Sequence, residues 1–157
     1  CSAYPSVHTC AGSDTSTMSV SASVAPSCSM DSSPMTFGTY DGVVANASMA
    51  LEAMAAIVST CTSGAAAIIT INAGASAGSD SADAPARRMT AGEGNYLAYQ
   101  VYSDVGRSTV WGNTSPTGVA LTGTGDPQTL TAYGSVTASQ LAAPGVYNDQ
   151  LTVTITY

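Results

Sequence analysis

The sequence predicts an all-β protein, a sandwich built from short antiparallel strands. Three observations predict this fold class. Apolar residues recur at every second position in several segments, turn residues separate those segments, and no segment has the apolar spacing of a long helix. The chain has 157 residues and a 45% hydrophobic content, enough for one domain with a core, and it contains no linker and no repeat.

The N-terminal half predicts three strands, one of them isolated. Residues 1–16 are irregular in composition, whereas residues 17–26 alternate small apolar side chains with polar ones, mainly serine, the period of a half-buried strand. Residues 33–42 are predicted as a short strand that an Asp-Gly turn closes. Residues 45–61 are ambiguous, because their first half has helical propensity and their second half resembles a strand. Residues 65–74 are predicted as a buried strand.

The middle of the chain predicts a loop followed by a hairpin. Residues 74–86 have the Gly/Ser composition of a flexible loop. Residues 95–104 alternate, with Leu97, Tyr99 and Val101 on one face. Residues 108–113 are expected to complete a hairpin with that strand, and residues 115–127 are rich in turn residues.

Two further strands are predicted near the C-terminus, over residues 128–136 and 147–157. The second alternates cleanly up to Tyr157. A strand at this end of the sequence, together with the isolated alternating segment 17–26, indicates a sheet in which one strand is misplaced. We therefore expect an unpaired strand edge in this fold.

The charge composition excludes several kinds of partner. Only 8% of the residues are charged, there is no lysine, and the net charge is −7. Nucleic acids and anionic membranes are not expected partners, because both require clustered Lys and Arg. No run of 18 apolar residues is present, so no membrane span is predicted. A surface rich in Ser and Thr suits an extracellular protein.

The cysteines are Cys1, Cys10, Cys28 and Cys61, with no C-x-x-C pair among them. An even number in a chain of low charge favours two disulfides formed in an oxidising compartment. Four cysteines allow three pairings, of which we favour Cys28–Cys61 and Cys1–Cys10. A lipidated N-terminal cysteine, or a chain that begins after a removed signal peptide, remains an alternative for Cys1.

No set of residues indicates an enzyme, a metal site or a cofactor. His8 is the single histidine and lies in an irregular segment, where a solvated side chain is the simpler interpretation than a catalytic base. Asp80 and Asp83 are too few for a calcium site, which needs six to eight oxygen ligands. Asp31 and Asp41 do not have a spacing that identifies a glycosidase.

Seven stretches carry a more specific signal when they are taken together and in order. They are VAPSCSM...MTFGTYDG (24–42), IVSTCTSG (57–64), RRM (87–89), YLAYQVYSD (96–104), VWGN (110–113), LTAYGSV (130–136) and PGVYNDQLTVTITY (144–157). Over about residues 17–157 the sequence resembles the spore coat protein U domain. This family includes the pilin subunits of archaic chaperone–usher pili, such as the Csu type of Acinetobacter.

The resemblance implies an incomplete immunoglobulin-like sandwich. Subunits of this family lack the last strand and so have an open apolar groove. A periplasmic chaperone fills the groove first. At the outer-membrane usher, the N-terminal segment of the next subunit replaces the chaperone, so that the fold is completed by a donor strand from a neighbouring subunit through β-strand addition.

Carried onto this sequence, the resemblance divides the chain into two parts. Residues 1–25 are an N-terminal extension that includes the donor strand (about 17–25), and residues 26–157 are the pilin domain. The donor side chains are then Met18, Val20, Ala22 and Val24. The acceptor groove is lined by Leu151, Val153, Ile155 and Tyr157. Cys28 and Cys61 stand at the family's disulfide positions, which agrees with the pairing favoured above.

The function that follows is a structural pilin subunit, secreted through the periplasm to the cell surface, that polymerises head to tail into a fimbrium for adhesion and biofilm formation. Its expected partners are identical or related subunits, a chaperone and an usher, with no enzyme activity and no cofactor. A tip adhesin and a spore or cell-surface coat protein are alternatives. The segment 1–16 departs from the family pattern. It extends the donor strand, forms a Cys1–Cys10 loop or cross-links neighbours.

Overall fold

The computed structural model describes residues 11–78 and 82–157, and in these residues the fold is all-β, as predicted. The 3₁₀ helix η1 spans Ser115–Thr117. The strands are β1 (Cys28–Ser32), β2 (Leu51–Cys61), β3 (Ala66–Ile71), β4 (Arg88–Gly92), β5 (Asn95–Tyr102), β6 (Val119–Thr122), β7 (Gln128–Val136) and β8 (Val153–Thr156).

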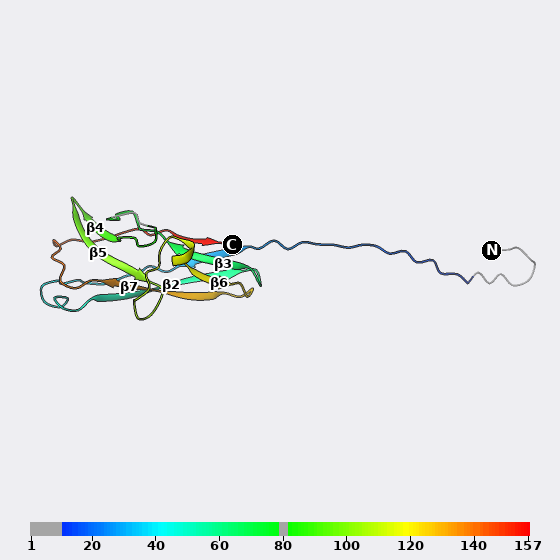
Figure 1. The fold of residues 1–157 in the computed structure, drawn as a ribbon, viewed down its shortest axis with the longest axis horizontal. Helices are drawn as coiled ribbons and strands as arrows, with labels where there is room; N and C mark the ends of the chain where they lie inside the picture. The colour runs from blue at the N-terminus through cyan, green and yellow to red at the C-terminus, as the bar shows by residue number, and fades with distance from the viewer. Residues whose placement is uncertain (1–10, 79–81) are drawn as a thin grey trace, which may run out of the picture.

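The strands form two antiparallel sheets that pack as a sandwich (Figure 1). The larger sheet has the order β1-β2-β7-β5-β4, and the smaller has the order β6-β3-β8. Apolar side chains of both sheets meet between them, including Ile57 and Val101 from the larger sheet and Ile69 and Ile71 from the smaller. Trp111 is almost fully buried among them and donates its indole N–H to the carbonyl of Ile69 at 2.8 Å.

Strand β5 has the predicted alternation: Leu97, Tyr99 and Val101 are buried, and the residues between them are more exposed. The ambiguity of residues 45–61 is resolved in favour of a strand, because β2 is a strand along its whole length, from Leu51. The half with helical propensity pairs with β7, and the second half pairs with both β7 and β1, so these ladders override a weak local propensity for helix. Residues 45–50 form turns and bends.

The expected hairpin strand over 108–113 is reduced to one bridge, between Tyr102 and Val110. Three short strands were not predicted. β1 lies between the predicted segments 17–26 and 33–42, the turn-rich stretch 115–127 contains β6, and β4 pairs with β5 through a bulge between Thr90 and Gly92. All three are edge strands of four or five residues, too short to show a clear period in the sequence.

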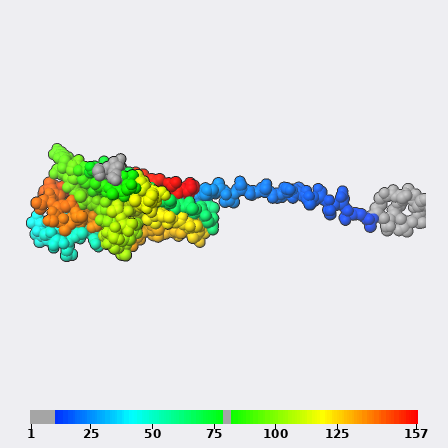
Figure 2. All heavy atoms as spheres, viewed as in Figure 1, coloured from blue at the N-terminus to red at the C-terminus, as the bar shows by residue number. Residues whose placement is uncertain are grey.

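Three predicted strands, or parts of strands, form no ladder. Residues 17–26 and 33–42 are without regular secondary structure, apart from a turn that begins at Gly42, and residues 147–152 make only an isolated bridge through Asn148. Residues 11–27 leave the domain as an extended segment, beside the end of the chain at which β8 terminates (Figures 1 and 2). These segments have the sequence of strands but form no continuous ladder with any described residues.

Candidate functional site

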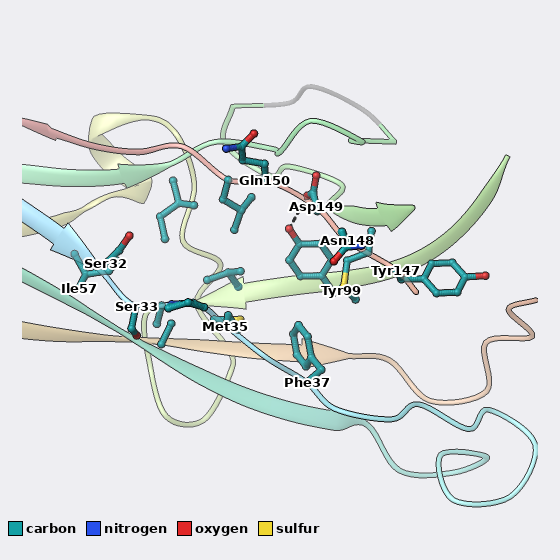
Figure 3. Close-up of a pocket in the computed structure, with 17 residues that line it drawn as sticks. Ser32, Ser33, Met35, Phe37, Ile57, Tyr99, Tyr147, Asn148, Asp149 and Gln150 are labelled. Carbon is teal, nitrogen blue, oxygen red and sulfur yellow. Dashed lines mark hydrogen bonds between the residues drawn. The ribbon is translucent and has the colours of Figure 1, made fainter. Parts of the chain in front are cut away.

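The candidate site lies between two sheet edges that face each other. Strand β1 is an edge of the larger sheet and β8 is an edge of the smaller one. No strand of the described chain lies between residues 33–37, which follow β1, and residues 147–151, which precede β8. A cavity opens between these two segments (Figure 3).

The backbone of residues 147–155 presents one unpaired side. Asn148 exchanges hydrogen bonds with Thr90 at 2.9 and 3.0 Å, and the carbonyl of Gln150 accepts from the N–H of Ala75 at 3.1 Å. Backbone groups alternate in direction along a strand, so those of Tyr147, Asp149 and Leu151 point the other way. They form no backbone hydrogen bond with any described residue.

The same alternation continues into β8. The carbonyl of Thr152 accepts from the N–H of Asn72 at 3.0 Å, and Thr154 and Thr156 are paired with β3. The backbone groups of Val153 and Ile155 therefore face outward with those of Leu151. Alternate residues from Tyr147 to Ile155 thus offer a continuous row of hydrogen-bonding groups, which we call the open edge.

The opposite wall of the cavity is also unpaired. The N–H of Ser33 donates to the carbonyl of Ala56 at 2.9 Å, but the backbone of residues 34–39 makes no hydrogen bond to any described residue. Met35 and Phe37, in this wall, turn their half-buried side chains toward the core. Backbone polar groups in a protein are nearly always paired, so two facing unpaired segments indicate room for one more strand.

The floor between the walls is apolar. It is formed by Ile57, Ile71, Tyr99, Val101 and Ala132, and the cavity measures about 550 Å³. A second cavity of about 970 Å³ shares lining residues with the first, so the two form one groove. The groove runs from the β1–β8 edges toward the loops at the other end of the domain, where Leu141 and Val146 line it.

One polar pair interrupts the apolar floor. The Tyr99 hydroxyl donates to Asp149 Oδ2 at 2.7 Å, and Asp149 Oδ1 accepts from the N–H of Ser76 at 3.1 Å (Figure 3). Burial raises the pKa of the Tyr99 hydroxyl above its ordinary value of 10.0, and the hydrogen bond to the Asp149 carboxylate adds to this. Asp149 is thereby fixed with its backbone on the open edge and its side chain turned inward.

A family profile, that of the Spore Coat Protein U domain, matches residues 14–154. The chain belongs to the spore coat protein U domain family. Protein U of Myxococcus xanthus is a relative with 38% identity over 156 residues, which are 94% of this chain and 87% of Protein U. The family expected from the sequence motifs is therefore confirmed.

The fold of this spore coat protein U domain is also found in a solved structure. It is similar, with a TM-score of 0.59 and 17% identity, to a chain in the CsuC–CsuE chaperone–tip adhesion subunit pre-assembly complex from the archaic chaperone–usher Csu pili of Acinetobacter baumannii. The similarity covers 85% of the present chain but only 40% of that chain. At this identity the comparison establishes a common fold.

The residues predicted to donate a strand lie outside the domain. Met18, Val20 and Val24 are 87%, 88% and 84% exposed, and Ala22 is exposed as well. The segment that carries them forms no ladder with its own domain (Figure 2). In this spore coat protein U domain, apolar alternation and solvent exposure occur in the same segment, which is unusual for a strand sequence.

Three of the four residues predicted to line the acceptor groove, Leu151, Val153 and Ile155, lie along the open edge. Leu151 lines the cavity, and Val153 and Ile155 are half-buried and pack against the core. Tyr157 is 54% exposed at the end of the chain. The sequence motifs did not single out the opposite wall (Met35 and Phe37) as part of the groove. The sequence did hold a signal for this wall, namely the strand predicted over residues 33–42, which has no partner strand among the described residues.

The predicted disulfide between Cys28 and Cys61 is present, and it joins residues that are paired in register between β1 and β2. Cys1, Cys10, His8 and Asp80 lie outside the described residues. Within the described residues, no group of three or more His, Cys, Asp or Glu is placed to hold a metal. In the same part of the chain, no helix has the length and hydropathy to cross a membrane.

Proposed function

We propose that this chain is a structural subunit of an extracellular fimbrium that polymerises by donor-strand exchange. Residues 1–25 are the extension that carries the donor strand, and residues 26–157 are the receiving domain. The donor side chains are Met18, Val20, Ala22 and Val24. The observation that supports this most directly is the groove with two unpaired walls and an apolar floor, in a chain that also exposes an apolar alternating segment.

The donor segment runs antiparallel to the open edge in this proposal. That edge is the longer of the two walls, and antiparallel ladders are slightly more stable per residue than parallel ones. Met18 then lies toward Ile155 and Val24 toward Tyr147. Val20 and Val24 project into the groove, where the side chains of Leu151 and Phe37 are accessible to them.

The tail of a chain does not reach its own groove in this orientation. Val24 is followed by only three residues before Cys28, a span of at most about 14 Å. The donor segment from Met18 to Val24 is about 20 Å long as a strand. The N-terminal segment leaves the domain beside the end of β8, which is the Ile155 end of the groove (Figure 1). The donor therefore comes from a second copy, and repeating this head-to-tail contact gives an open filament.

The partners in this proposal are identical or related subunits in the fiber. Before assembly, a periplasmic chaperone covers the groove, and an outer-membrane usher mediates the exchange. The location is the bacterial cell surface, reached through the periplasm, with a role in adhesion and biofilm formation. The Csu complex whose chain shares this fold supports these partners.

The second candidate function is a spore or cell-surface coat protein, which the description of the family favours. A tip adhesin is a further alternative, because the solved complex with a chain of this fold includes a tip adhesion subunit. Electron micrographs of native material separate these functions. Thin filaments that antibodies decorate along their length support a shaft subunit, label only at the ends supports a tip, and a continuous layer supports a coat.

The donor assignment predicts the effect of charge in the segment. In a chain with Val20→Asp and Val24→Asp, two carboxylates would have to enter an apolar groove, and we expect at least a hundredfold loss of polymer. The yield of sedimentable filament measures this. Folding of the monomer should be unchanged, because both residues are outside the domain.

The matched control is Ser19→Asp with Ser23→Asp in the same segment. These positions alternate with the apolar ones and face solvent in the proposed strand, so polymerisation should remain within a few-fold of the unchanged chain. Equal loss in both double variants, or no loss in either, would show that the apolar face of the segment does not enter the groove.

A further inference from the structure

The domain carries a group of exposed aliphatic side chains at the end opposite to the N-terminal tail. They belong to the loops 42–50 and 137–146. Val43, Val44, Leu141 and Val146 are 71%, 77%, 85% and 79% exposed, and we call these four residues the distal platform. Figure 2 shows the two loops, in cyan and orange, side by side at this end of the molecule.

The distal platform is held in place by hydrogen bonds of its two loops with each other and with Tyr40 and Asp41, which precede loop 42–50. The N–H of Ser139 donates to the carbonyl of Asn46 at 2.9 Å, and the Tyr40 hydroxyl donates to the carbonyl of Thr137 at 2.8 Å. Asp41 Oδ1 accepts from the N–H groups of Val43 and Val44 at 2.9 and 3.1 Å. The exposed apolar surface is thus ordered, and contact with a partner would remove it from water.

The groove leads directly to the distal platform. Val43, Leu141 and Val146 line the second cavity, which continues the groove past Tyr147. A donor strand that runs antiparallel to the open edge has its Val24 end here. Its next three residues reach at most about 14 Å before Cys28 of the incoming copy, where the incoming domain begins. The domain of the incoming copy must therefore lie against this end.

We infer that the distal platform binds the domain of the incoming copy, so that successive subunits join through their domains as well as through the donor strand. This inference depends on the proposed donor-strand function. The surface that reaches the platform is the tail end of the incoming domain, which includes Pro26, the turn 62–65 and Tyr157, itself 54% exposed.

The chemistry of the two surfaces is compatible. The loops 42–50 and 137–146 contain no charged residue, and neither do residues 25–27 or the turn 62–65. No charge is therefore buried without a partner when the surfaces meet. The apolar side chains of the platform can be covered by the Pro26 and Tyr157 rings of the second copy.

The test separates binding of the domain from binding of the strand. The platform variant is the full chain with Val44→Asp, the platform residue that lines neither cavity of the groove. The matched control is Val105→Asp, which changes a valine that is 72% exposed on another loop. Circular dichroism checks that each variant is folded. The critical concentration for polymerisation is measured by sedimentation, and it should rise at least tenfold in the platform variant and less than twofold in the control.

A synthetic peptide of residues 16–26 then measures the groove alone, because it carries no domain. Binding is measured on full chains whose own donor carries Val20→Asp and Val24→Asp. We expect the same Kd, within threefold, with and without Val44→Asp, because this residue does not line the groove. Unchanged polymerisation of the platform variant overturns the inference and leaves the donor function intact. A platform variant that binds the peptide much more weakly also overturns it, because the substitution then acts on the groove.

If the peptide does not bind to either chain, the proposed donor function fails, and the inference fails with it. A direct measurement of the contact is available in the same system. A photo-crosslinking residue at position 146 of assembled polymer should attach to residues 25–28, 62–65 or 157 of the neighbour. Attachment at the middle of the neighbour's domain would contradict the inference.

Discussion

Arg87 holds the region beneath the groove together from a fully buried position. Its side chain is 1% exposed and donates to the carbonyls of Ile71, Asn72 and Trp111 at 2.8, 2.9 and 2.7 Å. It also donates to Gln100 Oε1 at 2.6 Å. Burial lowers the pKa of this guanidinium to about 10, so it remains charged at neutral pH. Each guanidinium nitrogen of this buried cation donates to a nearby acceptor. Because these acceptors belong to or adjoin β3 and β5, the hydrogen bonds hold the two strands in place relative to each other.

Tyr99 provides a prediction at the scale of one residue. Its raised pKa means that the folded state keeps the phenolic proton above pH 10, whereas the unfolded chain, with the ordinary pKa of 10.0, releases it. The unfolded state then binds fewer protons, so this residue's contribution to stability is complete below pH 10 and falls as the pH rises above it.

In Tyr99→Phe this contribution is absent. We expect the variant to be about 1–2 kcal/mol less stable at pH 7, because Asp149 loses a hydrogen-bond donor. The difference from the unchanged chain should shrink above pH 10, by at most about 1.4 kcal/mol per pH unit. Urea unfolding at pH 7, 9, 10 and 11 measures it. A difference that stays constant across this range would contradict the assignment of the buried, protonated hydroxyl.

At the scale of the element, β1 is the strand whose position depends most on one covalent bond. It contacts the sheet through β2 alone, and it leads into the unpaired wall of the groove at Ser33. The disulfide at Cys28 anchors its first residue to the end of β2. We therefore attribute to this bond both stability and the correct placement of the groove wall.

The disulfide prediction is that reduction costs about 3–4 kcal/mol in the chain-entropy model, since the bond closes a loop with a sequence separation of 33 residues. Urea unfolding with and without a reductant measures it in a Cys1→Ser, Cys10→Ser chain, where only Cys28 and Cys61 respond. A cost below about 1 kcal/mol would show that strand pairing alone holds β1. The reduced chain should also bind the donor peptide more weakly.

At the same scale, the limits of local sequence patterns are visible in β2 and in residues 33–42. Ala, Met and Glu in the first half of β2 favour a helix by intrinsic propensity, but β7 provides a continuous ladder along this half, from Leu51 to Ala56. Residues 33–42 have the pattern of a strand and no partner. In both segments the neighbours determined the outcome, and these are distant in the sequence.

At the scale of the whole molecule, the domain is a sandwich that lacks one strand between its edges. A groove with unpaired walls lowers the stability of the isolated domain, because the half-buried side chains of Met35, Phe37 and Leu151 contact water and backbone groups of the walls lack partners. A ligand that adds the missing strand should therefore stabilise the domain by mass action.

We predict that the peptide of residues 16–26, at a hundredfold excess over its Kd, stabilises the monomeric chain with Val20→Asp and Val24→Asp by about 2.7 kcal/mol. For a domain of this size that corresponds to a rise in Tm of about 5–10 °C. Differential scanning calorimetry measures it. A peptide with the same composition in scrambled order is the control, and an equal rise with both peptides would contradict specific strand addition.

The sequence by itself determined the fold class, the family, the Cys28–Cys61 pairing that its motifs indicated, and the inward faces of β5 and of residues 147–155. Side-chain alternation and composition are local properties, and they persist in any fold that the chain adopts. The tertiary structure alone decided that residues 34–39 and the open edge face each other without a strand between them, and that the groove ends at the distal platform. Backbone pairing depends on which strands become neighbours, and a pattern of side chains does not state that.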